Sequence, residues 1–295
     1  MFKRIHIEIS NICNVQCSFC PIVLRPKEIM SKNQFEHILV QALPHTEDIC
    51  LHLMGEPLAH PEFEEILNIS EDKKASIQIT TNGLLIERYA ELILNKKSVR
   101  QINFSLQAFQ DNFPEKPIES YLNPIFKFTE AALFQRPELY INFRLWNFGD
   151  ESFLKNENLI IEVEKRFNAR IKREVEPSGI KSKKVLKDKR LYLHFDSRFD
   201  WPSAQFPKRT EKGTCYGMRN HIGIHADGTV VPCCLDKEAT LNLGNCLKQD
   251  LKEILSSQRA QKIKHGFEAG HLVEDLCQKC TFIKRFDSKV KAIQN

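Results

Sequence analysis

Alternation of strand-like and helix-like patterns over the first two-thirds of the chain constrains the fold more than any other feature. Predicted strands span 4–9, 48–54, 75–81, 101–106 and 139–146, and predicted helices span 33–43, 61–69, 84–95, 120–134 and 153–167. Such alternation predicts a parallel sheet with functional residues at the carboxyl ends of its strands. Five or six strand–helix units are too few for a closed eight-stranded barrel. We therefore expect an open, partial barrel.

The sixth strand has two candidates, Ala169–Glu176 and Leu191–Phe195, and the pattern does not separate them. The chain is basic in this region: Lys165–Arg190 holds eleven lysines and arginines and three acidic residues. We interpret this stretch as a solvated helix end and loop. The alternative is an electropositive rim for an anionic substrate, a nucleic acid or an acidic redox partner.

Composition indicates a soluble protein that uses its cysteines for metal. The chain has 295 residues, 42% of them hydrophobic, and a net charge of +5. It has neither a signal peptide nor an apolar run of 18 residues, so we expect a cytoplasmic protein without a membrane span. Because cytosolic thiols stay reduced, ten cysteines in such a chain favour metal binding over disulfides.

Cys13, Cys17 and Cys20 form one short loop, CNVQCSFC, directly after the first predicted strand. Three thiolates at this spacing can hold three irons of a four-iron cluster and leave the fourth iron open. Electron-transfer ferredoxins instead supply four cysteines. The alternatives for these three residues alone are buried cysteines or a zinc site.

This loop resembles the CxxxCxxC loop of the radical S-adenosylmethionine (radical SAM) superfamily. The resemblance implies that the open iron chelates the amino and carboxylate groups of S-adenosylmethionine, and that Phe19 lies against the adenine. One electron then cleaves the sulfonium and yields a 5′-deoxyadenosyl radical, which takes hydrogen from a substrate. The protein aims this chemistry and excludes solvent.

Further motifs follow the next strands. Met54-Gly55-Glu56-Pro57 resembles the GGEP motif of the superfamily, which implies that Gly55, Glu56 and Pro57 contact the cofactor and that Glu56 accepts hydrogen bonds from its ammonium group. Gly-Glu-Pro alone is only a turn. Asn82, in Thr-Thr-Asn-Gly after the third strand, either faces the cofactor or forms a plain turn.

The fourth and fifth strands carry the remaining candidate cofactor contacts. Ser105 and Gln107 stand where the superfamily places a serine near the ribose. Asn142 and Arg144 share one face of an otherwise apolar strand, and buried polar groups need partners. A cofactor carboxylate or ribose would serve, and so would a structural salt bridge.

A second group of cysteines follows residue 213: Cys215, Cys233, Cys277 and Cys280. With the segment HIGIHADGTVVPCC, it resembles SPASM and twitch extensions of radical SAM enzymes. Because no cysteine follows Cys280, the resemblance implies one auxiliary [4Fe–4S] cluster held by these four residues. Cys234 and Cys246 are spares that could replace a ligand, and a structural zinc site is the alternative. We expect Cys50 to be a core residue, and we assign the histidines no role.

Together these features predict an α/β fold: a partial (β/α)6 barrel with a small C-terminal, cysteine-rich, SPASM/twitch-like domain. The expected boundaries are 1–195 for the barrel, 196–212 for a linker, 213–286 for the auxiliary-cluster domain and 287–295 for a tail.

The expected function is a radical SAM enzyme that modifies either a peptide or protein, or a nucleotide- or sugar-type metabolite. A flavodoxin- or ferredoxin-type protein is the expected electron donor, and nucleic acid is not favoured as a partner. The chain starts almost at its first strand, which weakens the peptide-maturase alternative because no leader-recognition domain precedes it. A different class of function is a non-enzymatic iron–sulfur or zinc protein, such as a sensor or binding module.

Overall fold

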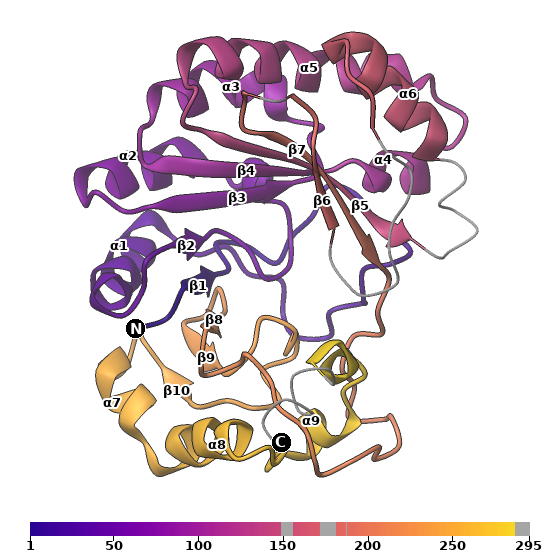
Figure 1. Ribbon diagram of the computed structural model, residues 1–295. Helices are drawn as coiled ribbons and strands as arrows, with labels where there is room; N and C mark the ends of the chain where they lie inside the picture. The colour runs from indigo at the N-terminus through magenta and orange to yellow at the C-terminus, as the bar shows by residue number, and fades with distance from the viewer. Residues whose placement is uncertain (149–155, 172–180, 187, 287–295) are drawn as a thin grey trace. The chain divides into compact units, whose positions relative to one another are not determined.

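The computed structural model describes residues 1–148, 156–171, 181–186 and 188–286. The chain divides into two compact units. We call the first the terminal unit, which comprises Met1–Ile12, Pro21–Gly55 and Phe199–Asn295, and the second the central unit, which comprises Cys13–Cys20 and Glu56–Arg198. Each unit is described separately (Figure 1).

The central unit holds a mostly parallel sheet in the order β3-β4-β5-β7-β6. Strands β3, β4, β5 and β7 are parallel, and only β6 runs antiparallel, against β7. The strands are β3 (Ile77–Thr81), β4 (Val99–Ser105), β5 (Tyr140–Phe148), β6 (Lys181–Lys184) and β7 (Leu191–Ser197); the helices are η2 (Pro57–Ala59), α2 (Phe63–Asp72), α3 (Ile86–Asn95), α4 (Gln107–Asn112), α5 (Ile118–Gln135) and α6 (Asn156–Phe167).

Helices α3, α5 and α6 lie along one face of this sheet (Figure 1). Apolar residues at helical spacing explain the packing: α5 buries Leu122, Ile125 and Phe126 on a single side. Phe104 of β4 and Phe143 of β5 pack edge to face with their ring centroids 6.0 Å apart, which fills the layer between sheet and helices. The opposite face of the strands is therefore free to carry polar residues.

The terminal unit holds its own strands in the order β10-β9-β8-β1-β2. Strand β1 pairs in parallel with both β2 and β8, whereas β8, β9 and β10 pair antiparallel. The strands are β1 (Arg4–Ile7), β2 (Ile49–Cys50), β8 (His221–Ile224), β9 (Thr229–Val231) and β10 (Gly244–Asn245); the helices are α1 (Lys32–Ala42), η1 (Leu43–His45), α7 (Leu251–Ser256), α8 (Gln258–Glu268), α9 (Asp275–Lys279) and η4 (Phe282–Phe286).

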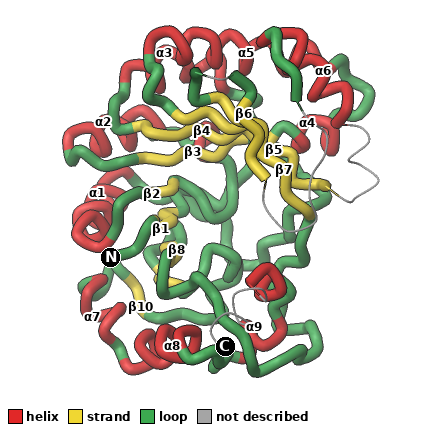
Figure 2. The backbone as a smooth tube through the Cα atoms, in the orientation of Figure 1, coloured by secondary structure: helices red, strands yellow, loops and turns green. Residues whose placement is uncertain are grey.

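Much of the terminal unit after residue 199 is loop (Figure 2). The regular parts have clear local causes. Ser31 caps α1 in a capping box with Gln34, in which each side chain satisfies the other residue's backbone N–H. Asp227-Gly228 turns the chain between β8 and β9, where Gly228 has a φ of +85° that suits glycine.

The predicted α/β class with a mostly parallel sheet is confirmed. Of the two candidates for the sixth strand, Leu191–Phe195 is correct, because β7 pairs in parallel with β5. Residues 169–171 form no strand, and 172–176 lie outside the described residues. The predicted second strand is much shorter than expected, since only Ile49–Cys50 pairs.

None of the described helices combines the length and apolarity needed to cross a bilayer. The predicted domain boundaries stay a prediction, and the expected tail, 287–295, lies outside the described residues.

Candidate active site and auxiliary metal site

Helix α4 of the central unit holds the cysteine loop in place. Asp111 accepts hydrogen bonds from the backbone N–H and the hydroxyl of Ser18, the latter at 2.6 Å. Asn112 accepts from the Gln16 backbone N–H at 2.9 Å and donates to the Cys17 sulfur at 3.1 Å. The loop therefore has a defined shape even though half of its residues are exposed to solvent.

The three thiols of this loop lie close enough to affect one another's ionisation. A hydrogen bond between Cys17 and Cys20 lowers the pKa of Cys17 and raises that of Cys20, so the two thiols share a proton. Burial raises the pKa of Cys13. Thiolates packed this closely repel one another, and bound cations such as cluster irons relieve the repulsion.

Glu56, also in the central unit, carries a buried carboxylate. It is 2% exposed and accepts hydrogen bonds from the backbone N–H groups of Leu58 at 3.0 Å and Asn82 at 2.7 Å. Burial raises its pKa to about 7, although these N–H groups oppose the shift. A carboxylate balanced in this way gains much from a cationic partner such as an ammonium group.

Asn82 connects the end of β3 to the cysteine loop. Its side-chain amide donates to Asn14 at 2.7 Å and contacts the Cys13 sulfur at 3.9 Å. The adjacent Gly83 has a φ of +81°, as expected for the predicted turn. Asn82 therefore forms the strand–helix turn and also contacts the cysteine loop, while its contact with the cofactor stays a prediction.

Gln107 provides a test of whether this site fits a bound cofactor. It is 7% exposed at the start of α4, and its Oε1 is buried without a hydrogen-bond partner among the described residues. Such an orphaned acceptor is costly unless a ligand supplies the donor. With three thiols and a buried carboxylate in the same unit, the donor set fits an iron–sulfur cluster and a cationic nucleoside cofactor.

Asn142 and Arg144 both face the polar side of the sheet, as predicted. Asn142 donates to the Asn103 side chain of β4 at 2.8 Å, and Arg144 contacts the Thr80 hydroxyl at 3.3 Å. Burial and the charge of Arg144 lower the pKa of His194 on β7 to about 4, so that His194 is neutral at physiological pH.

Other predicted contacts have simpler surroundings. The guanidinium of Arg198 lies 5.7 Å from the centroid of the Phe19 ring, a cation–π arrangement that covers one face of that ring. Ser105 ends β4, and Pro57 is buried in the first turn of η2. Gly55, in the terminal unit, has a φ of +77° and allows a backbone approach that a Cβ would block at 2.2 Å from the Ser10 carbonyl oxygen.

Four cysteines converge in the terminal unit. Burial and the neighbouring thiols raise the pKa values of Cys215 and Cys277, and each of these two residues is affected by both Cys233 and Cys280. Burial raises the pKa of Cys280 to about 11, with a further contribution from Cys233. These are the four residues predicted as auxiliary ligands.

Cys234 and His221 lie next to this set. His221, Cys233 and Cys234 place their ligand atoms within 4.8 Å of one another, and they are the tightest such group among the described residues. Sequence reasoning gave His221 no role, since its partners are twelve positions away along the chain. Burial raises the pKa of Cys246 to about 12, and Asp250 is the charged neighbour that adds to this shift. Because no thiol contributes to the shift, Cys234 is favoured over Cys246 as the replacement ligand.

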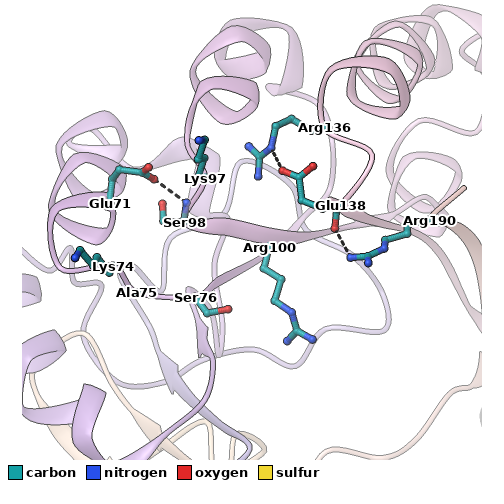
Figure 3. A pocket seen from close by; sticks show the side chains of 10 residues that line it. All are labelled: Glu71, Lys74, Ala75, Ser76, Lys97, Ser98, Arg100, Arg136, Glu138 and Arg190. Atoms are coloured by element: carbon teal, nitrogen blue, oxygen red, sulfur yellow. Dashed lines mark hydrogen bonds and ion pairs between the residues drawn. The ribbon is translucent and has the colours of Figure 1, made fainter.

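A basic pocket of about 420 Å³ lies at the amino ends of the central strands (Figure 3). Arg100, Arg136 and Arg190 contribute to it, but Arg136 is committed to the carbonyls of Leu94, Lys96 and Val99. Since Cys13 contacts Asn82 at the opposite, carboxyl end of β3, this pocket is at the other edge of the sheet from the thiols. Arg190, the residue of 165–190 that lines this pocket, therefore does not lie at the cysteine loop.

Sequence reasoning also missed Asp111, Asn112 and Asn103. The first two lie in a six-residue helix without a motif. Asn103 could have been found, because it alternates with Ser105 on one face of β4 just as Asn142 and Arg144 alternate on β5.

A parallel α/β sheet, a three-cysteine loop, a buried Gly-Glu-Pro carboxylate and a second set of clustered thiols define a radical SAM enzyme with an auxiliary iron–sulfur domain. Residues 7–133 match the radical SAM superfamily, and residues 215–281 match SPASM, an iron–sulfur cluster-binding domain. The chain therefore carries a radical SAM domain followed by a SPASM domain. The radical SAM domain implies a [4Fe–4S] cluster and S-adenosylmethionine as cofactors. The SPASM domain implies auxiliary iron–sulfur cluster binding.

Curated relatives are named GTP 3′,8-cyclases. A probable one from Methanococcus maripaludis is 31% identical over 108 residues, which cover 35% of this chain and 36% of the relative. One from Microcystis aeruginosa is 22% identical over 297 residues, covering 88% of this chain and 89% of the relative. The chain thus spans about a third to a half of the length of the archaeal relatives that it matches.

Solved structures share the fold at low identity. BtrN in complex with AdoMet and 2-DOIA superposes with a TM-score of 0.62 at 16% identity, covering 95% of this chain and 93% of BtrN. SuiB from Streptococcus suis, bound to its precursor peptide SuiA, gives a TM-score of 0.64 at 16% identity, with coverages of 100% and 73%. These similarities confirm the fold class.

Proposed function

We propose that this enzyme cleaves S-adenosylmethionine reductively at a cluster held by Cys13, Cys17 and Cys20. The observation that carries the proposal is the three-thiol loop, whose Cys13 contacts Asn82, the residue whose backbone N–H binds the buried carboxylate of Glu56. When bound, the cluster and cofactor supply a 5′-deoxyadenosyl radical that removes hydrogen from a substrate. A flavodoxin- or ferredoxin-type protein would deliver the electron.

The chain's own residues bind and orient the cofactor in this proposal. Glu56 accepts hydrogen bonds from the ammonium group, and burial strengthens that contact. The free Oε1 of Gln107 accepts a further donor from the cofactor. Arg144 supplies positive charge to the cofactor carboxylate, and Phe19 supplies an aromatic face to the adenine.

Further cofactor contacts come from the ends of the strands. Ser105 ends β4, and Asn142 of β5 pairs with Asn103 near the carboxyl end of β4, where hydroxyl and amide groups can bind the ribose. Asn82 orients the cysteine loop through Asn14, and Gly55 and Pro57 fix the backbone on either side of Glu56.

The second metal site is proposed to hold one auxiliary [4Fe–4S] cluster on Cys215, Cys233, Cys277 and Cys280. Mutual effects on the pKa values of these thiols support their convergence. The tightest ligand group, with atoms within 4.8 Å, instead includes Cys234 and His221, which makes Cys234 the alternative ligand. A single zinc ion requires ligand atoms closer together than a four-iron cluster does. Analysis of the bound metal distinguishes a zinc site from an iron–sulfur cluster.

For the substrate we propose a small anionic metabolite of the nucleotide or sugar type. Arg144 and the neutral His194 lie side by side on β5 and β7, and the indole N–H of Trp146 is buried without a hydrogen-bond partner among the described residues. Cationic and donor groups of this kind suit phosphates, bases and hydroxyls. The names of the curated relatives support the same class.

Anaerobic incubation of reconstituted protein with S-adenosylmethionine and dithionite tests the reaction. Formation of 5′-deoxyadenosine supports the proposal, and its absence with an intact reduced cluster refutes it. Nucleoside triphosphates, sugar phosphates and peptides are then compared as substrates through deuterium transfer into 5′-deoxyadenosine. Transfer from a peptide alone would reject the metabolite class.

A further inference from the structure

Glu8, the residue after β1 in the terminal unit, carries a buried carboxylate at the centre of a polar network. The side chain is 0% exposed. Both of its oxygens accept hydrogen bonds from the Arg25 guanidinium at 2.6 Å. Burial alone would raise the pKa of Glu8, but His225 and Arg25 together hold it below its ordinary value, so the carboxylate is ionised.

The same carboxylate also binds backbone from two other segments of the terminal unit. It accepts from the Met54 N–H at 3.1 Å and from the Ala226 N–H at 3.3 Å. His225 Nδ1 lies 3.5 Å away, and its Nε2 contacts the Asp236 carbonyl at 2.9 Å. One side chain therefore joins four stretches of chain.

Each of these stretches leads directly to a residue of the proposed chemistry. Glu8 stands five residues before Cys13, and Arg25 stands five residues after Cys20. Met54 is two residues before Glu56, and Ala226 is seven before Cys233. Arg25 is itself fixed, because its Nε donates to the Lys237 carbonyl at 2.6 Å and its backbone N–H to Glu238 at 3.1 Å.

Stability alone does not require charges here. A buried ion pair loses much hydration, and an apolar pair of similar volume is often as stable. An apolar pair cannot, however, accept the Met54 and Ala226 N–H groups. A charged acceptor also fixes the direction of those bonds more strongly than a neutral one does.

We propose that Glu8 is a positioning residue that sets the Met54-Gly55-Glu56 backbone, and with it the ammonium contact of Glu56, by accepting the Met54 N–H. Arg25 holds the Glu8 carboxylate in place. The inference rests on the proposed binding of S-adenosylmethionine by Glu56. It adds a requirement that none of the cluster ligands or cofactor contacts supplies.

The test is the Glu8→Leu/Arg25→Met double variant, which removes the charges together and keeps an apolar pair. We expect iron content close to wild type and a lower thermal midpoint, because the Met54 and Ala226 N–H groups lose their acceptor. The dissociation constant for S-adenosylmethionine should rise about tenfold, which is equivalent to about 1.4 kcal/mol. It is measured by the change in the electron paramagnetic resonance spectrum of the reduced catalytic cluster on titration with the cofactor.

Glu8→Asp keeps the charge but withdraws the carboxylate by one methylene group, and it should give a smaller rise of about threefold. It also serves if the apolar double variant does not fold. Glu71→Leu is the matched control, because Glu71 likewise accepts a backbone N–H, from Ser98 at 2.7 Å, at the amino ends of the strands (Figure 3). It should leave the dissociation constant unchanged.

An unchanged dissociation constant in folded, cluster-loaded Glu8→Asp or double variant overturns the inference. Equal rises in Glu71→Leu and the Glu8 variants also overturn it, since they would indicate a general effect of destabilisation. If wild-type protein itself shows no spectral change with S-adenosylmethionine, the proposed function fails instead.

Discussion

The two cysteine sets differ in number and in surroundings. The loop set has three thiols, of which Cys13 is exposed, Cys20 half-buried and Cys17 buried, and it is bordered by polar side chains such as Asn82 and Asn112. The set of the terminal unit has four mutually interacting thiols, and burial is the leading cause of the raised pKa values of Cys215, Cys277 and Cys280. An incomplete, polar site suits a metal that binds an external ligand, whereas a complete, buried site suits structural or electron-transfer roles.

The largest expected contrast comes from removing one thiol of each set. Cys17→Ala should abolish formation of 5′-deoxyadenosine, because the catalytic cluster loses one of only three ligands. Cys277→Ala should remove about half of the iron while leaving cleavage of S-adenosylmethionine detectable.

Iron content and 5′-deoxyadenosine, measured on the same preparations, check both results. Cys50→Ala is the control, because Cys50 lies in β2 and is 1% exposed, and it should change neither quantity. Equal loss of cleavage in Cys17→Ala and Cys277→Ala would contradict separate roles for the two sets.

Glu56→Gln should weaken cofactor binding and stabilise the fold at high pH. The folded pKa of Glu56, about 7, is above the ordinary 4.5, so the folded state favours the protonated form. The stability that protonated Glu56 gives to the folded state is fully present below pH 4.5 and is lost as the pH rises through 7. Because glutamine cannot ionise, the variant should gain up to about 3 kcal/mol of unfolding free energy by pH 8.

Thermal midpoints of wild type and Glu56→Gln, compared from pH 5 to pH 8 without cofactor, check the sign. The difference should widen as pH rises, and a constant difference would contradict a raised pKa. Affinity for S-adenosylmethionine should fall at every pH.

A smaller effect concerns hydrogen bonds to sulfur. Asn112 donates to Cys17 at 3.1 Å. A hydrogen bond with Cys234 and burial raise the pKa of Cys233, and a hydrogen bond from His221 opposes that shift. Donors to cluster sulfurs stabilise the reduced state. Asn112→Leu should lower the midpoint potential of the catalytic cluster, and His221→Phe that of the auxiliary cluster. If each bond is worth about 1 kcal/mol, each shift is about 40 mV for one electron.

Potentiometric titration monitored by electron paramagnetic resonance resolves the two clusters. A shift in the midpoint potential of only the nearby cluster in each variant would support separate roles for the two cysteine sets. A shift of both clusters by either substitution would show that the two sets are electronically coupled.

Spacing along the chain made the main features predictable. The CxxxCxxC loop and the strand–helix alternation need only local sequence, and so the class of fold and the loop could be inferred. Motifs at strand ends were placed correctly for the same reason, since parallel strands bring their carboxyl ends to one edge. Asn82 illustrates this, because its contact with Cys13 joins residues 69 positions apart.

Features that depend on tertiary contacts were not predictable. Asp111 and Asn112 act on the loop from 93 to 96 residues away, and no periodicity marks them. His221 approaches Cys233 only because β8 and β9 form a hairpin. The second strand was overestimated because Leu51, Leu53 and Met54 are buried without pairing, so apolar alternation alone misled the prediction.

Strand β1 has β2 on one side and β8 on the other, and 170 residues of sequence, 51–220, separate these two neighbours. During synthesis on the ribosome, the edge of β1 therefore stays open until β8 emerges. An unpaired strand edge is a template for aggregation. A chain stopped before residue 221 would keep that edge exposed permanently, so truncation in front of the cysteine-rich segment should yield insoluble protein rather than a smaller working enzyme.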